Sequence, residues 1–553
     1  MRRSKYGGTM RFIYMAALGL SFAAAATSKA FAQPAMISAD AIREDVRVLS
    51  SDAFQGRGPG ERGESVTLAF LRGQFEAAGL APGGPGGSWF QDVHLVRVDS
   101  TERRLSIMVN GEQLPLQPTK DWSLNGSHAG QAVVDGAALV FVGFGIVAPE
   151  VGWDDYAGVD VRGKVVIMLP NDPDFDQPQG PFGGFARSKF ARGKAALAYE
   201  RGAAGVISIH RTALTSWPWQ QIANAAGDPI FRRLADPSPA GPSRLSAWLT
   251  DSAAAQMFNR AGLDLEALIR RAQQRGFQAV EIPLAMLSAA VTTSERPMMT
   301  RNIIARLEGT SRAAETVLIG AHWDAYGIGQ ADATGDTIRN GAIDNGIGTA
   351  TLLDVARAFG RAPRTQRTLL FVGYTSEEDG LLGAGEYVAR PVRPLETTAA
   401  VFNLDPHVAL PQTRSVELIG AGLTDLEQDL ARLAGAQGRS IEAEADPSAG
   451  WYFRSDHYTF AAAGVPTVYF RAGSDLVDGG SVEGRRRITS YNGQCYHQRC
   501  DEFQENWGMQ AAAQDGELVY ALAREIADSG RWPSWNGTAE FRTVREKSTA
   551  KRR

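Results

Sequence analysis

The sequence predicts an α/β protein with a mixed, largely parallel sheet, helices on both faces of that sheet, and an inserted small β-rich module. From Asn302 onward, apolar runs of strand length alternate with helical patterns, which is typical of parallel strands joined by helices. Between residues 128 and 290 the pattern changes to short apolar runs punctuated by glycine, which indicates the insert. The length of 553 residues favours two or three domains, because it exceeds that of one compact core.

The first residues predict a secretory signal peptide. Basic residues precede an apolar segment from Phe12 to Ala26, and Ala30-Phe31-Ala32 supplies the small residues that a signal peptidase needs. A membrane anchor needs about 20 apolar residues, and this run is shorter. We therefore expect residues 1–32 to be removed and the mature chain, beginning near Gln33, to be periplasmic or extracellular.

Two helices are expected next, one over Ser38 to Leu49 and one over Val66 to Leu80, with Ser38 as the cap of the first. The loop between them, QGRGPGERG, is rich in glycine and arginine. It suits either the rim of a cleft or a plain connector.

The insert is expected to contain three strands, a helix between the last two, and a following helix pair. These elements are Ala137 to Val147, Gly163 to Leu169, Ser188 to Arg201, Gly205 to His210, Ser252 to Ala261 and Leu265 to Arg275. At the other end of the chain, residues 541–553 are charged and lack apolar periodicity, which predicts a disordered tail.

Composition and cysteine content narrow the possible functions. The chain is 44% hydrophobic and 21% charged with a formal net charge of −4, so nothing indicates nucleic-acid binding. No membrane partner is expected after signal cleavage, and the sequence is silent on oligomeric state. The two cysteines, Cys495 and Cys500, suit a disulfide in an exported chain, and that bond would hold His497 between them.

Histidines and carboxylates follow several of the predicted strands. The run TLLFVGY is followed by adjacent Glu377 and Glu378, and the mutual repulsion of such a pair in a cleft favours a cation or a shared proton beside it. Ligands of α/β sheets gather outside the carboxyl ends of the strands. The other candidates at such positions are His322, Asp324, Asp344, Asp405 and His497.

Each candidate also has an ordinary structural interpretation. The glutamates suit an exposed acidic helix start, Asp344 a helix N-cap, Asp405 a strand-end turn and His497 a surface position. Taken together, however, His322, Asp344, Glu378, Asp405 and His497 form a set of nitrogen and oxygen donors. That set matches what two zinc-like ions roughly 3.5–4 Å apart require. Glu378 would then bind metal, and Glu377 would take a proton from water.

The order of motifs resembles the co-catalytic zinc exopeptidases, the family that contains bacterial leucyl aminopeptidases, aminopeptidase Y and glutamate carboxypeptidase. The matching elements are His322-Trp323-Asp324, Asp344-Asn345-Gly346-Ile347-Gly348, Glu377-Glu378-Asp379-Gly380-Leu381-Leu382-Gly383, Asn403-Leu404-Asp405, Ser455-Asp456-His457 and Tyr496-His497. The resemblance implies two zinc ions, one on His322 and Asp405, the other on Glu378 and His497, with Asp344 bridging both. It further implies Glu377 as general acid and base, Asp324 orienting His322, and Tyr452 bonding the tetrahedral intermediate. A packed aromatic is the alternative for Tyr452, and Asp456 and His457 receive no chemical role.

The insert resembles the protease-associated domain of secreted peptidases, through DDYAGVDVRGKVVIML and YERGAAGVISI. The expected organisation is then a signal peptide over 1–32, an N-terminal part of the peptidase domain over 33–127, the insert over 128–290, the catalytic domain over 291–540 and the tail over 541–553. The insert would shape or cover a substrate cleft.

These observations predict a secreted di-zinc exopeptidase acting on peptides. An aminopeptidase is favoured on family frequency alone, because neither Arg454 nor Arg471 is placed firmly enough by sequence to bind a substrate carboxylate. The alternatives are a carboxypeptidase or dipeptidase of the same family, or a non-catalytic, receptor-like binding protein of the same fold. The complete ligand set argues against the latter, and against one-zinc glutaminyl cyclase relatives.

Overall fold

The structure, a computed structural model, describes residues 37–175, 180–182, 193–215, 217–236, 243–331, 334–406, 408–537 and 539–549. The predicted signal peptide and the first part of the helix predicted from Ser188 lie outside these residues. Residues Met36–Arg553 belong to one compact unit. None of the helices in the described part of the chain has the length and apolar character needed to cross a membrane.

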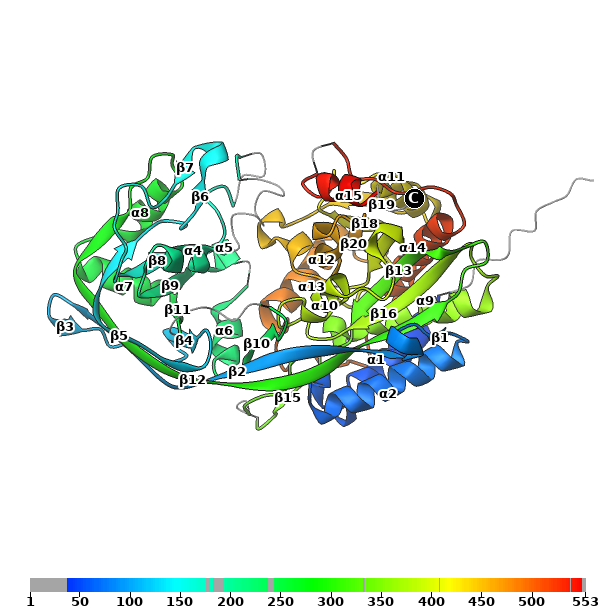
Figure 1. Ribbon diagram of the computed structural model, residues 1–553, viewed down its shortest axis with the longest axis horizontal. Helices are drawn as coiled ribbons and strands as arrows, with labels where there is room; N and C mark the ends of the chain where they lie inside the picture. Colours follow the sequence, from blue (N-terminus) through cyan, green and yellow to red (C-terminus); the bar gives the residue numbers. More distant parts are fainter. Residues whose placement is uncertain are drawn as a thin grey trace, which may run out of the picture. The chain divides into compact units, whose positions relative to one another are not determined.

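The core of the fold is a sheet in which two blocks of parallel strands flank a long antiparallel strand, β12 (Val280–Leu307) (Figure 1). One block consists of β17 (Thr398–Asn403), β13 (Arg312–His322) and β16 (Arg367–Tyr374). The other consists of β5 (Gly130–Phe141), β8 (Val165–Met168), β9 (Gly205–His210) and β11 (Leu245–Thr250). The predicted mixed α/β class is confirmed.

Helices cover both faces of the first block. The helices on one face are α1 (Ala39–Leu49), α2 (Arg62–Ala77), α9 (Gly348–Arg361) and α14 (Gln510–Ala527); α10 (Leu382–Ala389) and α12 (His457–Ala462) cover the other. Successive side chains of β16 point to opposite faces of the sheet, which explains this arrangement. Phe371 contacts Phe75 of α2 and Phe359 of α9, whereas Tyr374 contacts Phe460 of α12.

The first predicted helix is confirmed with its cap, since the Ser38 hydroxyl accepts a hydrogen bond from the Ala41 amide at 3.2 Å. The helix pair of the insert is also confirmed as α7 (Asp251–Arg260) and α8 (Leu265–Ala272), and α4 (Lys194–Glu200) lies within the range predicted for the helix before them. The remaining short elements are β1 (Ala81–Pro82), β3 (Glu112–Gln113), β6 (Val147–Ala148), β7 (Trp153–Asp154), β10 (Ile230–Arg233), β14 (Gly327–Ile328), β15 (Ile338–Arg339), α5 (Thr212–Thr215) and α6 (Trp219–Ala225).

The insert belongs to the same compact unit as the rest of Met36–Arg553. Its core includes Ile107 and Val109 of β2 (Phe90–Val109) and Trp122 of β4 (Trp122–Gly126), all upstream of the boundary predicted at residue 128. Strand β2 pairs with β12 from Phe90 to Val109, so one ribbon runs from the block of β13 and β16 into the insert. The sequence missed this continuity because pairing between distant strands leaves no local signal. The likeness to a protease-associated domain stays a prediction.

Two further expectations differ from the structure. Among the apolar runs after Asn302, those that begin at Ser415 and Thr467 contribute to a second, three-stranded sheet. It is formed by β18 (Ser415–Ile419), β19 (Ser440–Ala443) and β20 (Tyr469–Ala472), beside α11 (Leu426–Ala436). The tail predicted to be disordered contains helix α15 (Arg542–Thr549). Its Arg545 is buried and donates to the carbonyls of Leu395 and Thr398, a long-range contact that local composition cannot reveal.

Candidate metal centre

Three of the predicted site segments follow neighbouring parallel strands. His322 is the last residue of β13, Asp405 comes two residues after β17, and Glu378 comes four residues after β16. Because the carboxyl ends of parallel strands meet at one edge of a sheet, these side chains converge. Asp344 joins them from the turn before α9, and His497 from the loop after α13 (Gly480–Gln494).

The five predicted ligands form two groups that share Asp344. The first is His322, Asp344 and Asp405; the second is Asp344, Glu378 and His497; in each, the candidate ligand atoms lie within 4.8 Å of one another. The two carboxylate oxygens of Asp344 face different groups. Oδ1 lies 3.3 Å from His322 Nε2, and Oδ2 lies 3.1 Å from His497 Nε2. Asp344 is therefore positioned to bridge two cations.

Two observations are consistent with metal binding at the cluster: buried ligand atoms without a hydrogen-bond partner, and the concentration of charged groups. His322 Nε2 and Glu378 Oε1 are buried, and neither makes a hydrogen bond of good geometry to another described residue. Burial alone would lower the pKa of His322, but the surrounding carboxylates, Glu377 first, outweigh it and raise that pKa well above its usual value. Burial and the charge of Asp344 raise the pKa of Glu378. Buried carboxylates of this kind are stabilised by positive charge, and imidazole and carboxylate donors suit zinc.

Glu377 lies between the cluster and Asp324. Its side chain is 8% exposed, and Oε2 lies 3.9 Å from His322 Nε2. Asp324 Oδ1 accepts a hydrogen bond from the Glu377 amide at 3.2 Å. The predicted bond from the His322 ring to the Asp324 carboxylate is replaced by a contact with the Asp324 carbonyl oxygen, 3.2 Å from Nδ1; the carboxylate oxygen is 3.7 Å away. Asp324 thus contacts both the ligand and the candidate base.

The role predicted for Tyr452 stays a prediction. Its buried ring packs against His457, with ring centroids 4.8 Å apart, and against Phe541. A cavity of about 10 Å³ between Asp344, Glu377 and Asp405 is lined instead by other side chains: Trp451, Arg454, Ser455, Tyr469 and Tyr496. That volume approaches the room one water needs. Tyr496, directly before His497, is a tyrosine that faces the cluster, and the adjacent Tyr-His motif was the signal for it.

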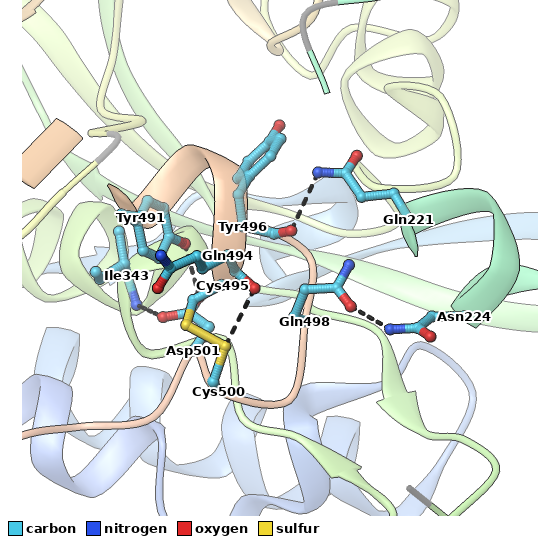
Figure 2. The surroundings of a disulfide bond; sticks show 10 residues. All are labelled: Gln221, Asn224, Ile343, Tyr491, Gln494, Cys495, Tyr496, Gln498, Cys500 and Asp501. Carbon is cyan, nitrogen blue, oxygen red and sulfur yellow. Dashed lines mark hydrogen bonds between the residues drawn. A yellow bond between two sulfur atoms is a disulfide. The ribbon is translucent and has the colours of Figure 1, made fainter. Parts of the chain in front are cut away.

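Figure 2 shows the loop closed by Cys495 and Cys500, with Asp501 directed at the backbone of Ile343. The predicted disulfide is confirmed, with Cα atoms of Cys495 and Cys500 5.1 Å apart. Asp501, the next residue, accepts hydrogen bonds from the amides of Ile343 and Asp344 at 2.8 and 3.0 Å. One short loop therefore holds His497 and also the backbone of the bridging carboxylate. The sequence analysis missed Asp501, because no recognised motif includes it.

Tyr326 is a second residue that sequence analysis missed. Its hydroxyl shares a 2.9 Å hydrogen bond with His497 Nδ1, which leaves Nε2 directed at Asp344 and Glu378. Such bonds to the outer ring nitrogen select the tautomer of a histidine ligand.

Arg57, from the loop whose role the sequence left open, is fully buried behind the cluster. Its guanidinium donates to four backbone carbonyls, those of Leu49, Trp323, Asn340 and Gly341, at 2.7–3.0 Å. Trp323 lies beside His322 and Asp324, and Gly341 begins the turn that carries Asp344. Burial lowers the pKa of Arg57 to about 10, partly offset by Asp501, Asp324, Asp344 and Glu378. The loop is thus a structural anchor for both ligand segments.

Replacing Arg57 with methionine should strongly destabilise the protein. The four carbonyls would lose their donors in a buried environment, at about 1–3 kcal/mol for each group left unsatisfied. We expect Arg57→Met to lower the free energy of unfolding by at least about 3 kcal/mol, measured by urea denaturation, and Arg62→Met, on the exposed side of α2, to change it little. A loss below about 1 kcal/mol for Arg57→Met would contradict the anchoring role.

Asp456 and His457, which received no role from the sequence, lie behind the ligands. Burial raises the pKa of Asp456 well above its usual value, and the charge of His322 offsets only part of this rise. The His457 ring stacks on Tyr469 at 4.3 Å, and burial lowers its pKa to about 3, so it is neutral. His457 therefore packs the wall of the site.

The fold and this cluster define an α/β protein with paired histidine and carboxylate groups of the kind that hold two metal ions. Residues 302–521 match the model of peptidase family M28. The match contains all five candidate ligands.

Individual relatives agree with this match. A "Probable zinc metalloprotease" of Pyrenophora tritici-repentis (strain Pt-1C-BFP) is 32% identical over 109 residues, 20% of this chain and 24% of that protein. A "Probable lipoprotein aminopeptidase LpqL" of Mycobacterium tuberculosis (strain ATCC 25618 / H37Rv) is 25% identical over 201 residues, 34% of this chain and 37% of that protein. The matches thus span well under half the length of these relatives.

Among solved structures, an aminopeptidase from Aneurinibacillus sp. strain AM-1 is similar over 90% of this chain and 96% of its own, with a TM-score of 0.52 and 18% identity. At that identity the likeness concerns the fold alone. It extends over the insert as well as over the segment that carries the metal cluster, because it covers nearly the whole of both chains.

Proposed function

We propose that this protein is an exported di-zinc aminopeptidase. The observation that carries the proposal is the position of Asp344, whose two carboxylate oxygens each face a different histidine within 3.3 Å. A single-metal site has no use for a carboxylate shared in this way. The disulfide between Cys495 and Cys500 supports export, because such bonds persist in oxidising compartments.

In this proposal His322 and Asp405 hold one zinc ion, Glu378 and His497 hold the other, and Asp344 binds both. Two zinc ions there would polarise the scissile carbonyl and supply a water of lowered pKa. The role of the protein is then to hold these five donors in place. It does so through the strand ends, the Arg57 anchor and the loop closed by the disulfide.

Glu377 is the proposed general acid and base. Its carboxylate lines the small cavity beside Asp344 and Asp405, where it can accept a proton from water and return it to the leaving amine nitrogen. The hydrogen bond from its backbone amide to Asp324 holds the segment in position. Tyr496 and Arg454 line the same cavity and are the donors available to a substrate carbonyl oxygen.

Arg454 is the observation that favours the second candidate, a carboxypeptidase or dipeptidase. Within the described residues its guanidinium forms no ion pair; it donates to the Tyr496 hydroxyl at 3.3 Å and packs over Trp451. An arginine so positioned suits a substrate carboxylate. Arg471, the other arginine considered, is buried and paired with Glu417, which removes it from this role.

Zinc content and zinc dependence test the proposal. We expect elemental analysis to find two zinc ions per chain, and a chelator to abolish hydrolysis of aminoacyl-arylamides until zinc is restored. Peptides with a blocked amino terminus and a free carboxyl terminus serve as the comparison. Cleavage of these peptides in place of arylamides would establish the carboxypeptidase. Zinc binding without cleavage of either would make the protein a binding protein and overturn the proposal.

A further inference from the structure

A cavity of about 430 Å³ adjoins the metal cluster, a volume within the range of ligand sites in proteins. Its wall comes from two parts of the chain that are distant in sequence. The insert contributes Leu214, Trp217 and Trp248, and the catalytic part contributes Phe453, Arg454 and His497. The cavity therefore exists only because the insert meets the catalytic part.

The insert side of the cavity is aromatic. The rings of Trp217 and Trp248 lie 5.8 Å apart in an edge-to-face arrangement, and His210 packs against Trp217 with ring centroids 5.0 Å apart. Phe453 and Leu214 are buried side chains of the same wall. Aromatic walls of this kind bind apolar groups, and above all other aromatic rings.

The cavity opens toward the metal cluster. His497, a candidate ligand, lies in its wall, and Arg454 lines both this cavity and the small cavity between Asp344, Glu377 and Asp405. A peptide bound with its scissile carbonyl at the cluster can therefore extend a neighbouring side chain into the larger cavity.

Hydrogen bonds hold the two walls together. Asn171 of the insert donates to the Ser448 carbonyl at 3.0 Å, and Gln221 donates to the Tyr496 carbonyl at 3.2 Å. Figure 2 shows Gln221 and Asn224 directed at the loop closed by the disulfide, where Asn224 also donates to Gln498. The insert is thus attached to the loop that carries His497, so the pocket is formed before substrate arrives.

We propose that Trp217 and Trp248 form a specificity pocket, built by the insert, that selects peptides with a large apolar, preferably aromatic, side chain next to the scissile bond. This inference rests on the proposed peptidase function. A small side chain would leave the pocket unfilled, and a positively charged one would lose its hydration against the tryptophans and face the like charge of Arg454.

The test compares three single variants on phenylalanyl- and alanyl-arylamides. We expect the wild type to favour the phenylalanyl substrate, and Trp217→Ala and Trp248→Ala to reduce the ratio of the two kcat/KM values by about 10-fold or more. Hydrolysis of the alanyl substrate should change little, which also shows that the variants fold. Trp219→Ala is the matched control, because Trp219 packs on His210 beside Trp217 but is absent from the cavity wall.

An unchanged ratio in both tryptophan variants, or an equal fall in Trp219→Ala, would overturn the inference. If no substrate is cleaved, the pocket can still be tested by calorimetry. The measurement compares the binding of phenylalanine amide and of alanine amide to the zinc-loaded protein. Tighter binding of phenylalanine amide that is lost in Trp248→Ala would support the pocket even where the peptidase proposal fails. Equal binding of the two amides by the wild type would refute it.

Discussion

Glu377→Gln is expected to retain both zinc ions and to lower kcat by about 10²–10⁴-fold, the usual contribution of a single general base. The substitution keeps the shape of the side chain but removes the carboxylate that accepts the proton. Glu377 belongs to neither of the two ligand groups, so zinc content should stay at the wild-type value. Its backbone bond to Asp324 does not depend on the side chain and should persist.

Elemental analysis and steady-state kinetics on the same preparation separate the two effects. Glu386→Gln provides a matched control, because Glu386 is also a buried glutamate but pairs with Arg390 on α10, away from the cluster. Turnover of Glu377→Gln near the wild-type rate would remove Glu377 from the mechanism. Loss of zinc would instead make it a ligand.

His497→Ala is expected to cost metal occupancy. Substitution of a residue that only supports a metal ligand typically costs 10–100-fold in affinity, so loss of a direct ligand should cost at least that much. Because the other group, His322, Asp344 and Asp405, is unchanged, we expect zinc content to fall from two toward one per chain, with a corresponding loss of activity.

Zinc titration of the chelator-treated protein measures the effect. His94→Ala serves as control, since His94 is an exposed residue of β2 outside the cluster. Two equivalents of zinc with unchanged affinity in His497→Ala would refute the ligand assignment. His322→Ala should weaken the other position, so that the two variants distinguish the two groups.

The ligands could be predicted because each depends on a local pattern. His322, Glu378 and Asp405 follow runs of apolar residues that end at the same edge of a parallel sheet, a position that the order of strands and helices implies. The helix cap at Ser38 and the disulfide between Cys495 and Cys500 are local features of the same kind.

Other residues of the site could not be found in this way. Arg57 was part of a loop of unassigned role, and Asp501 belonged to no motif, although both hold the backbone around Asp344. Tyr452 received a role from family resemblance, but its ring packs against His457 and Phe541, whereas Tyr496 lines the cavity. Which of two tyrosines faces a site depends on how the segments that carry them pack.

The sequence alone thus determined the α/β class and named the candidate donors, because strand periodicity and donor chemistry are properties of neighbouring residues. Only the tertiary structure decided that the two oxygens of the Asp344 carboxylate face different histidines. It also decided that tryptophans of the insert line the same cavity as His497. Such contacts join residues far apart in the chain, and their geometry follows from the packing of whole elements, which no local pattern encodes.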